Sequence, residues 1–349
     1  MSKLIIRLSL ILFWVVLIFG VLYLPKWKVL NLNANAINIF VWGDILEPSV
    51  IQAFERETGI KVRLNYYSSN EELIVKLKAT RGVGYDLIIP SDYAIPTLVQ
   101  EDLLKQIDQT QFHHWEKLNP RLLGHPFDPQ NRYSIPFEWE VFGFGIDKNQ
   151  FKRSSFDASW KLVFDPAAID YKITMINDPI EAILFGAFYL FGDVEHLTSD
   201  QLLQVKHLLI EQKKWIEAYT DFRGDYFLAT KNCPLVVASS SYIFRAMRKF
   251  PFIDFVMPKE GSFITIESLC IPKASKKEKL VYRLINFLFR PESIVAHYEA
   301  FGFFPSSLHA LDKLELNLDM QNLLLDSKEN FNRLHFTHLL ATEQQLRDL

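Results

Sequence analysis

Two strand–helix–strand units follow an apolar leader, and this alternation restricts the chain to an α/β fold. Residues 37–42 have the pattern of a strand, 48–59 that of a helix beginning at proline and ending at glycine, and 60–66 that of an alternating strand. A second helix over 69–79 starts at a Ser-x-x-Glu capping pattern and precedes a strand ending at Pro90. Strands alternating with helices predict a largely parallel sheet.

A second α/β set is expected further along the chain. Residues 134–147 should form two extended pieces, because Phe142-Gly143-Phe144-Gly145 has too many glycines for a helix interior. The later strands are expected at 172–176, 235–238 and 252–257, and the later helices at 178–189, 198–215, 279–289 and from residue 326 onward.

The leader indicates that the chain is exported. An apolar run over residues 8–24 follows Lys3 and Arg7, an order that keeps the N-terminus in the cytoplasm and sends the rest across the membrane. Ala34-Asn35-Ala36 has the small-x-small pattern of a cleavage site, whereas the long apolar run and the lysines after it suit an anchor. Residues 1–36 are therefore a signal peptide or an uncleaved membrane anchor. A lipid-anchored N-terminus is excluded because no cysteine lies near the leader.

Composition narrows the possible partners. The 349 residues have room for two domains, and a net charge of −3 with scattered Lys and Arg argues against nucleic acid as a partner. The only two cysteines are Cys233 and Cys270. They could pair outside the cytoplasm, but two buried free thiols are the simpler interpretation.

Polar residues follow two of the predicted strands. Gly43-Asp44 comes after the first strand and Ser91-Asp92-Tyr93 after the third, so both loops should meet where α/β sheets bind ligands. Asp44 beside Trp42 could hold an ammonium group by charge and by cation–π attraction. The alternative is an ordinary loop aspartate before the next helix.

Asp178 and Glu181 flank Pro179 at the start of a predicted helix. Their spacing is that of a capping box, and this structural role is favoured by the local sequence. The helix dipole would also keep both side chains anionic and available to an ammonium group.

Other acids are less distinctive. Glu267, before an apolar run, is a cap or an inward carboxylate, and Glu138 and Glu140 share a face that we expect to be exposed to solvent. Gly82-Val83-Gly84 follows a helix, which is wrong for a dinucleotide loop, and the chain has no Walker motif, nucleophile elbow or zinc spacing. We therefore expect no catalytic residue, cofactor or bound metal.

Many short segments match one protein family in the same order. They include AFERETGIKV, SNE, YDLIIPS and PFDP, and they lie at 53–62, 69–71, 85–91, 126–129, 133–136, 267–269, 271–272, 284–288 and 290–291. Together they resemble the spermidine/putrescine-binding proteins that serve bacterial ABC importers. The resemblance covers nearly the whole chain after residue 36.

This resemblance implies an α/β, two-lobed periplasmic binding protein fold of type II-like form, with hinge crossovers. One lobe would comprise 37–140 plus 263–311, and the other 141–262 plus 312–349. The implied protein is a periplasmic monomer, free or anchored to the outer face of the inner membrane through residues 8–24, that delivers its ligand to ABC permease subunits.

The family's binding positions correspond to Trp42, Asp44, Ser91, Tyr93, Asp178, Glu181 and Glu267. Four carboxylates suit a polyamine with two or more ammonium groups. The sequence departs from the family at Ser239 and Thr265, where relatives have aromatic walls, at Phe303, where a tyrosine is expected, and at Gly43-Asp44-Ile45, which replaces Thr-Glu-Tyr. We therefore expect an oligoamine ligand with altered or weaker selectivity.

Three other functions are considered. Ferric iron would require tyrosines and a histidine around the cleft, whereas the matched positions are mainly carboxylates. An anchored sensor would report a bound solute to a partner. A hydrolase with paired carboxylates is disfavoured because Asp178 and Glu181 lie at one helix end and do not face each other across a bond.

Overall fold

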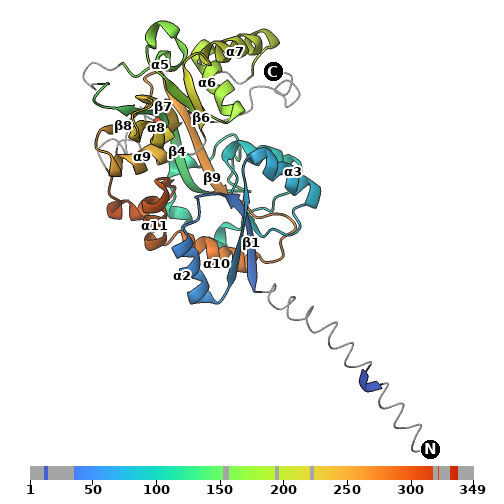
Figure 1. Ribbon diagram of the computed structural model, residues 1–349. Coiled ribbons are helices and arrows are strands. Elements are labelled where there is room, and N and C mark those ends of the chain that lie inside the picture. Colours follow the sequence, from blue (N-terminus) through green and yellow to red (C-terminus); the bar gives the residue numbers. More distant parts are fainter. Residues whose placement is uncertain are drawn as a thin grey trace, which may run out of the picture.

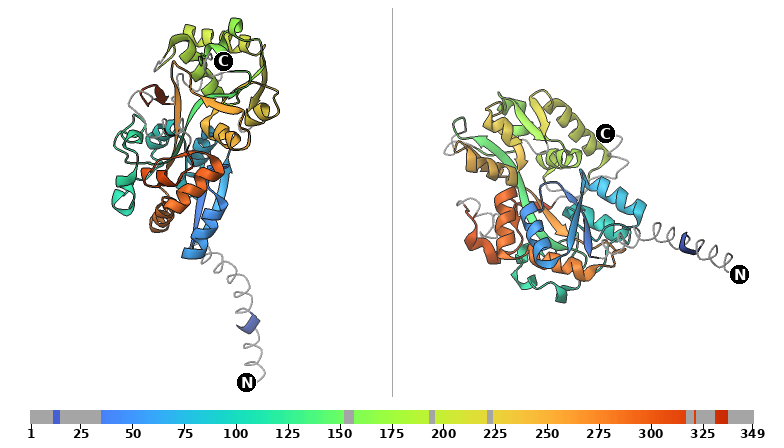
Figure 2. Two further views of the ribbon diagram at one scale, coloured as in Figure 1. Left: turned by 90° about the vertical axis from the view of Figure 1, so that its left-hand side faces the viewer. Right: turned by 60° about the horizontal axis from the view of Figure 1, so that its bottom comes forward.

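The chain forms two lobes joined by two long strands. The computed structural model describes residues 12–14, 35–151, 157–192, 196–220, 224–316, 321 and 331–336. The strands β4 (Ile135–Asp147) and β9 (Ser262–Leu269) run between the lobes (Figure 1), and the two-part shape persists in the turned views of Figure 2. The expected two-lobed α/β fold is confirmed, and the exact lobe boundaries stay a prediction.

The first lobe contains a three-stranded parallel sheet with the order β2-β1-β3. Its strands are β1 (Ala36–Trp42), β2 (Lys61–Tyr67) and β3 (Leu87–Ile88), and its helices are α2 (Pro48–Thr58), α3 (Asn70–Thr80), α4 (Ile95–Gln100), α10 (Glu278–Leu288) and α11 (Pro291–Phe301). β1 is buried on both faces, because Ile37 and Ile39 pack into one apolar core and Phe40 into another. Burial on both faces is typical of a strand inside a parallel sheet.

Local sequence signals place the helix ends in this lobe. Gly59 ends α2 in the left-handed conformation, with φ of 70°. The Ser69 hydroxyl caps α3 by accepting a hydrogen bond from the Glu72 amide, as predicted. The returning carboxylate of Glu72 accepts from the amide of Ser68 instead of Ser69, so the second half of the predicted capping box lies one residue earlier.

The second lobe contains most of an eight-stranded sheet with the order β11-β9-β4-β7-β5-β6, in which β8 and β10 also pair with β4. The further elements are β5 (Ile173–Ile176), β6 (Ile216–Thr220), β7 (Leu235–Ser239), β8 (Ile253–Val256), β10 (Phe304–Pro305), β11 (Leu334–Phe336), α5 (Lys161–Phe164), α6 (Pro179–Phe191), α7 (Ser199–Gln212), α8 (Gly224–Ala229) and α9 (Ser240–Lys249). β5 pairs in parallel with β6 and β7, but β4 pairs antiparallel with β7, β8, β9 and β10. The prediction of a largely parallel sheet is therefore correct for the first lobe and wrong around β4.

β4 is one continuous strand of 13 residues, not the two predicted pieces. Its glycines let neighbouring elements approach closely, because a Cβ at Gly145 would lie 2.5 Å from Ile243 Cδ1 and one at Gly143 would lie 2.6 Å from Phe255 Cζ. At the C-terminal end, residues 334–336 form a strand where a helix was expected. The rest of that expected helix falls largely outside the described residues.

Almost all of the predicted leader (residues 1–36) also lies outside the described residues, apart from 12–14, 35 and 36. Within the ranges that the structure describes, no helix combines the length and apolar character needed to cross a membrane. Cys233 and Cys270 are both free and buried in separate apolar cores, which confirms the simpler interpretation of the two thiols.

Candidate ligand-binding site

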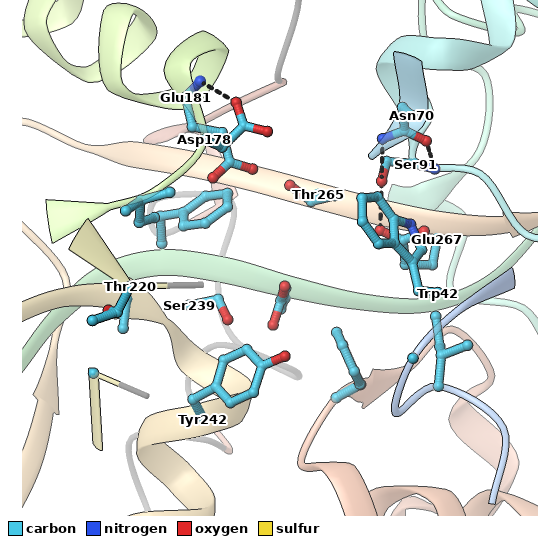
Figure 3. Close-up of a pocket in the computed structure, with 18 of the residues that line it drawn as sticks. Trp42, Asn70, Ser91, Asp178, Glu181, Thr220, Ser239, Tyr242, Thr265 and Glu267 are labelled. Carbon is cyan, nitrogen blue, oxygen red and sulfur yellow. Dashed lines mark hydrogen bonds between the residues drawn. The ribbon is translucent and has the colours of Figure 1, made fainter. Parts of the chain in front are cut away.

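A cavity of ≈ 150 Å³ lies between the two lobes (Figure 3). Its wall comes from the ends of β1, β3, β5, β6 and β7, from the start of α6 and α9, and from the middle of β4 and β9. The lining residues are Trp42, Gly43, Ile45, Ser68, Asn70, Ser91, Tyr93, Glu140, Phe142, Ile176, Asp178, Glu181, Thr220, Gly224, Val237, Ala238, Ser239, Tyr242, Thr265, Glu267 and Phe303. The predicted meeting of strand ends at one crevice is therefore observed.

Among the described residues, the charged groups of this wall all have the same sign. Four carboxylates line the cavity, from Glu140, Asp178, Glu181 and Glu267, and the described lining residues include no lysine, arginine or histidine. Burying several anions without a cation is unfavourable, because desolvation and mutual repulsion add. The cavity is therefore suited to a positively charged ligand.

Glu267 is held in place at the first-lobe end of the cavity. The Ser91 hydroxyl donates to Glu267 Oε1 at 2.7 Å, and Asn70 Nδ2 donates to the Ser91 hydroxyl at 3.0 Å (Figure 3). Glu267 Oε2 and the Trp42 indole nitrogen are buried and make no hydrogen bond of normal geometry, although Trp42 lies close enough to Glu267 to lower the pKa of that carboxyl. These two atoms leave a donor and an acceptor at the wall that a bound ligand could use.

The protonation of Glu267 depends on its surroundings. Burial raises its pKa well above the ordinary value, the Ser91 hydrogen bond opposes that rise, and the nearby carboxylates of Asp92 and Glu140 add to it. A cation in the cavity would favour the ionised form and reverse this effect.

Asp178 and Glu181 lie at the second-lobe end of the cavity (Figure 3). Asp178 Oδ1 accepts hydrogen bonds from the amides of Ile180 at 2.8 Å and Glu181 at 3.0 Å, so the predicted N-terminal cap of α6 is confirmed. Both side chains also line the cavity, so one residue pair caps the helix and contributes charge to the wall.

Tyr93 lines the cavity and is close enough to the acids at the second-lobe end for their charges to affect its pKa. It lies in the short turn after β3, and burial raises the pKa of its phenol, with further contributions from Glu71, Asp178 and Glu181. Since the phenol stays neutral, its hydroxyl can either donate or accept a hydrogen bond.

Glu138 and Glu140 are not exposed as predicted. Glu138 has only 4% of its surface accessible, and Glu140 is partly buried in the cavity wall. The prediction was wrong because this face of β4 is turned inward: Glu140 lines the cavity between the lobes, and Glu138 lies opposite the buried Glu267 of β9. The local sequence contained no warning, because acids that alternate with large apolar residues are the usual pattern of a strand with one face in solvent.

Tyr242 was also missed. It lines the cavity from the first turn of α9, directly after β7, and burial and the Glu140 carboxylate raise the pKa of its phenol. The polar run Ser239-Ser240-Ser241 after a predicted strand marked this loop by the same rule that selected Ser91.

Of the remaining positions discussed from the sequence, three line the cavity and Asp44 does not. Ser239, Thr265 and Phe303, the positions that depart from the family pattern, all line the cavity. Asp44 is exposed and is not among the lining residues, although it is close enough to Tyr242 to contribute to the raised pKa of that phenol. A direct contact between Asp44 and a ligand stays a prediction.

Two α/β lobes with an acidic cavity between them define a solute-binding protein. A sequence profile described as "Bacterial extracellular solute-binding protein" matches residues 49–321. The chain therefore belongs to this family, which consists of binding proteins and not of enzymes.

Individual relatives agree with this assignment. The chain is 29% identical over 275 residues to the spermidine/putrescine-binding periplasmic protein of Escherichia coli, covering 77% of each chain. It is 28% identical to a putrescine/cadaverine-binding protein of Pseudomonas aeruginosa, covering 73% of this chain and 75% of the relative. A solved Listeria monocytogenes structure, described provisionally as a spermidine/putrescine ABC transporter, superposes with a TM-score of 0.80 at 27% identity, covering 90% of this chain and 96% of the other.

Proposed function

We propose that this protein captures a linear polyamine outside the cytoplasm and delivers it to the membrane subunits of an ABC importer. The observation that carries the proposal is a cavity whose wall, in the part of the chain that the structure describes, has four carboxylates and no basic residue. The relatives named for spermidine, putrescine and cadaverine support the same ligand class.

The ligand would be held at both ends. Amines of this kind are protonated at neutral pH, as lysine side chains are, with a pKa of roughly 10. Asp178 and Glu181 would bind one terminal ammonium group, and Glu267, oriented by Ser91, would bind the other. Each ammonium–carboxylate contact at about 4 Å contributes on the order of 4 kcal/mol at an effective dielectric near 20, before desolvation is subtracted.

The uncharged part of the wall would contact the methylene groups. Trp42 lies beside Glu267 (Figure 3), Phe303 lines the cavity and packs against the same first-lobe core as Trp42, and Phe142 lies on β4. Such contacts favour an alkyl chain between charged ends over a compact cation. Ferric iron suits this wall less well, because no histidine is among the described lining residues.

The cellular setting is part of the same proposal. The apolar run over residues 8–24 supports export, with the leader either removed or kept as an anchor on the outer face of the inner membrane. The protein would act as a monomer that docks on permease subunits after capturing its ligand. If the leader is not cleaved and no permease is encoded near this protein, an anchored solute sensor would be favoured over a transport protein.

Isothermal titration of the purified full-length chain with putrescine, spermidine and spermine tests the ligand class. We expect saturable binding of at least one of the three, and none of butane-1,4-diol, which has the length of putrescine without its charges. Glu267→Gln should weaken the binding by at least about tenfold, because an ammonium group loses an ionised partner. Absence of binding heat for all three amines would refute the proposed function.

A further inference from the structure

The start of β1 is built into the fold at the place where the sequence offers a cleavage site. Ala34-Asn35-Ala36 would be cut after Ala36, and within residues 1–36 these two alanines are the only small residues separated by one position. Ala36 is the first residue of β1 and pairs with Lys61 of β2, and both Ala36 and Ile37 are fully buried. The candidate cleavage point therefore lies inside the sheet and not in a linker before it.

Asn35, on the amino-terminal side of this point, is held by hydrogen bonds to the rest of the first lobe. Its side-chain amide donates to the carbonyl of Gly59 at 2.9 Å, which joins it to the residue that ends α2. Its own carbonyl accepts from the amide of Lys61 at 3.0 Å, which extends the β1–β2 pairing by one residue. Cleavage after Ala36 would remove both hydrogen bonds and fray the start of the sheet.

A lysine beside Ala36 makes a new amino terminus unfavourable at this point. Lys277 Nζ donates to the Ala36 carbonyl at 2.7 Å and pairs with the buried Asp86 carboxylate at 3.1 Å. A chain cut after Ala36 would begin with an ammonium group on Ile37, because an α-amino group has an ordinary pKa of about 8. The Ile37 nitrogen is bonded to the same carbonyl carbon, so this ammonium group would lie within about 5 Å of Lys277 Nζ. Burying one cation next to another is unfavourable.

The start of β1 also lies away from the cavity. Trp42 at the other end of this strand lines the cavity, whereas Figure 1 shows the start of β1 at the outer end of the first lobe. Residues 25–34 separate the apolar run from Asn35, and ten residues span at most about 35 Å. A leader kept in the membrane would therefore hold the first lobe close to the membrane surface without crossing the cavity.

We propose that the chain is not cut after Ala36 and that residues 8–24 stay attached as an anchor in the cytoplasmic membrane, with both lobes outside. The inference rests on the export that the proposed function includes, and it decides between a removed and a retained leader. The apolar run has 17 residues, which reaches the lower limit for a membrane span, and Lys26 and Lys28 follow it at the position of the interface. A tether of this length sets the effective concentration of the protein at its importer.

Expression of the full-length chain in a Gram-negative host tests the inference. The protein should sediment with the membranes, stay there in roughly 1 M sodium chloride, which screens attraction between charges, and be released by detergent. Protease added to spheroplasts should digest it, and its intact mass should include residues 8–24. A soluble periplasmic protein that begins at Asn35 or Ile37 would overturn the inference. If that soluble protein still binds a polyamine, the proposed function stands, whereas an anchored protein that binds none of the three amines would reject the proposed function alone.

A matched pair of chains tests the contacts that carry the inference. The cleavable signal peptide of a periplasmic protein replaces residues 1–34 in one chain and residues 1–36 in the other, so that the mature chains begin at Asn35 and at Ile37. The first should be soluble and melt as the full-length protein does. The second should melt several degrees lower, because it loses the hydrogen bonds of Asn35 and Ala36 and buries an ammonium group. Equal melting temperatures would overturn the claim that the fold excludes cleavage after Ala36.

Discussion

At the scale of single residues, Glu138 and Glu267 face each other across the β4–β9 ladder. Directly opposed side chains in an antiparallel pair have Cβ atoms roughly 5 Å apart, and like charges at this distance destabilise the pair. Both acids are buried, and each has a carboxylate oxygen without a hydrogen-bond partner. Burial raises the pKa of Glu138, and the carboxylates of Glu267 and Glu140 raise it further. In the ligand-free protein, ionising both acids therefore costs stability.

We predict that Glu138→Gln stabilises the ligand-free protein at mildly alkaline pH. Because the pKa of Glu138 is higher in the folded than in the unfolded chain, the folded protein binds more protons between the two values. The free energy of unfolding then falls as the pH rises from the ordinary pKa through the folded one. The variant has no carboxyl to ionise at this position, so its free energy of unfolding does not fall in this way. Near pH 8 its melting temperature should therefore exceed that of the wild type by roughly 2–4 °C, which corresponds to about 1 kcal/mol.

Comparing the Glu138→Gln variant with the wild type also cancels the pH-dependent contribution of His297 to stability, which has the opposite sign. Burial lowers the pKa of His297 to about 4, so that histidine costs stability as the pH falls, equally in both proteins. The difference between variant and wild type should therefore shrink towards pH 5. A variant that melts lower than the wild type at every pH would contradict the repulsion between the two acids.

At the scale of elements, the start of α6 combines a helix cap with a proposed binding position. The cap needs only a side-chain oxygen that accepts hydrogen bonds from the helix amides, whereas the binding position needs a negative charge. Asp178 caps the helix, as its local sequence indicated, and the tertiary structure also places its side chain in the cavity wall, where it could serve the proposed binding role.

Two substitutions of Asp178 separate these roles. Asp178→Asn keeps a capping oxygen and removes the charge, so we expect a nearly unchanged free energy of unfolding and at least about tenfold weaker polyamine binding. Asp178→Ala removes both the capping oxygen and the charge, and its free energy of unfolding should be lower than that of the Asn variant by about 1 kcal/mol. Urea unfolding and titration calorimetry measure the two quantities. Full affinity in the Asn variant would remove Asp178 from the ligand site.

Elements whose ends are marked by local signals were predicted well from the sequence. Gly59, Ser69 and Pro179 define helix ends through backbone conformation, side-chain capping and the missing amide of proline, all of which act within a few residues. β4 was predicted less well, because its length depends on which strands pair with it. Those partners come from far along the chain.

At the scale of the whole molecule, acids from both lobes meet across one cavity. Asp178 and Glu181 come from the second lobe, Glu267 is held by Ser91 of the first, and Glu140 lies on the strand between them. Without a cation these groups repel one another, and a multiply charged ligand would bridge the lobes. Ligand binding should therefore stabilise the molecule as a unit.

We predict that saturating polyamine raises the melting temperature of the full-length protein. A ligand at about 100 times its dissociation constant stabilises the folded state by about 2.7 kcal/mol, which shifts melting by several degrees. The shift should decrease between roughly 0.05 M and 0.5 M sodium chloride, because salt screens the partly exposed charges. Butane-1,4-diol at the same concentration is the control. An equally large shift with the diol would show that charge does not drive the binding.

The sequence alone determined the alternation of strands and helices, the main caps and the polar groups that follow strands β1 and β3. These features depend on residues near one another in the chain, whose backbone preferences and side-chain periodicity can be recognised directly. Only the tertiary structure decided that β4 lies inside a mixed sheet and that Glu138 and Glu140 point inward. The inward or outward direction of a side chain depends on which distant strands flank it, and no local pattern states that.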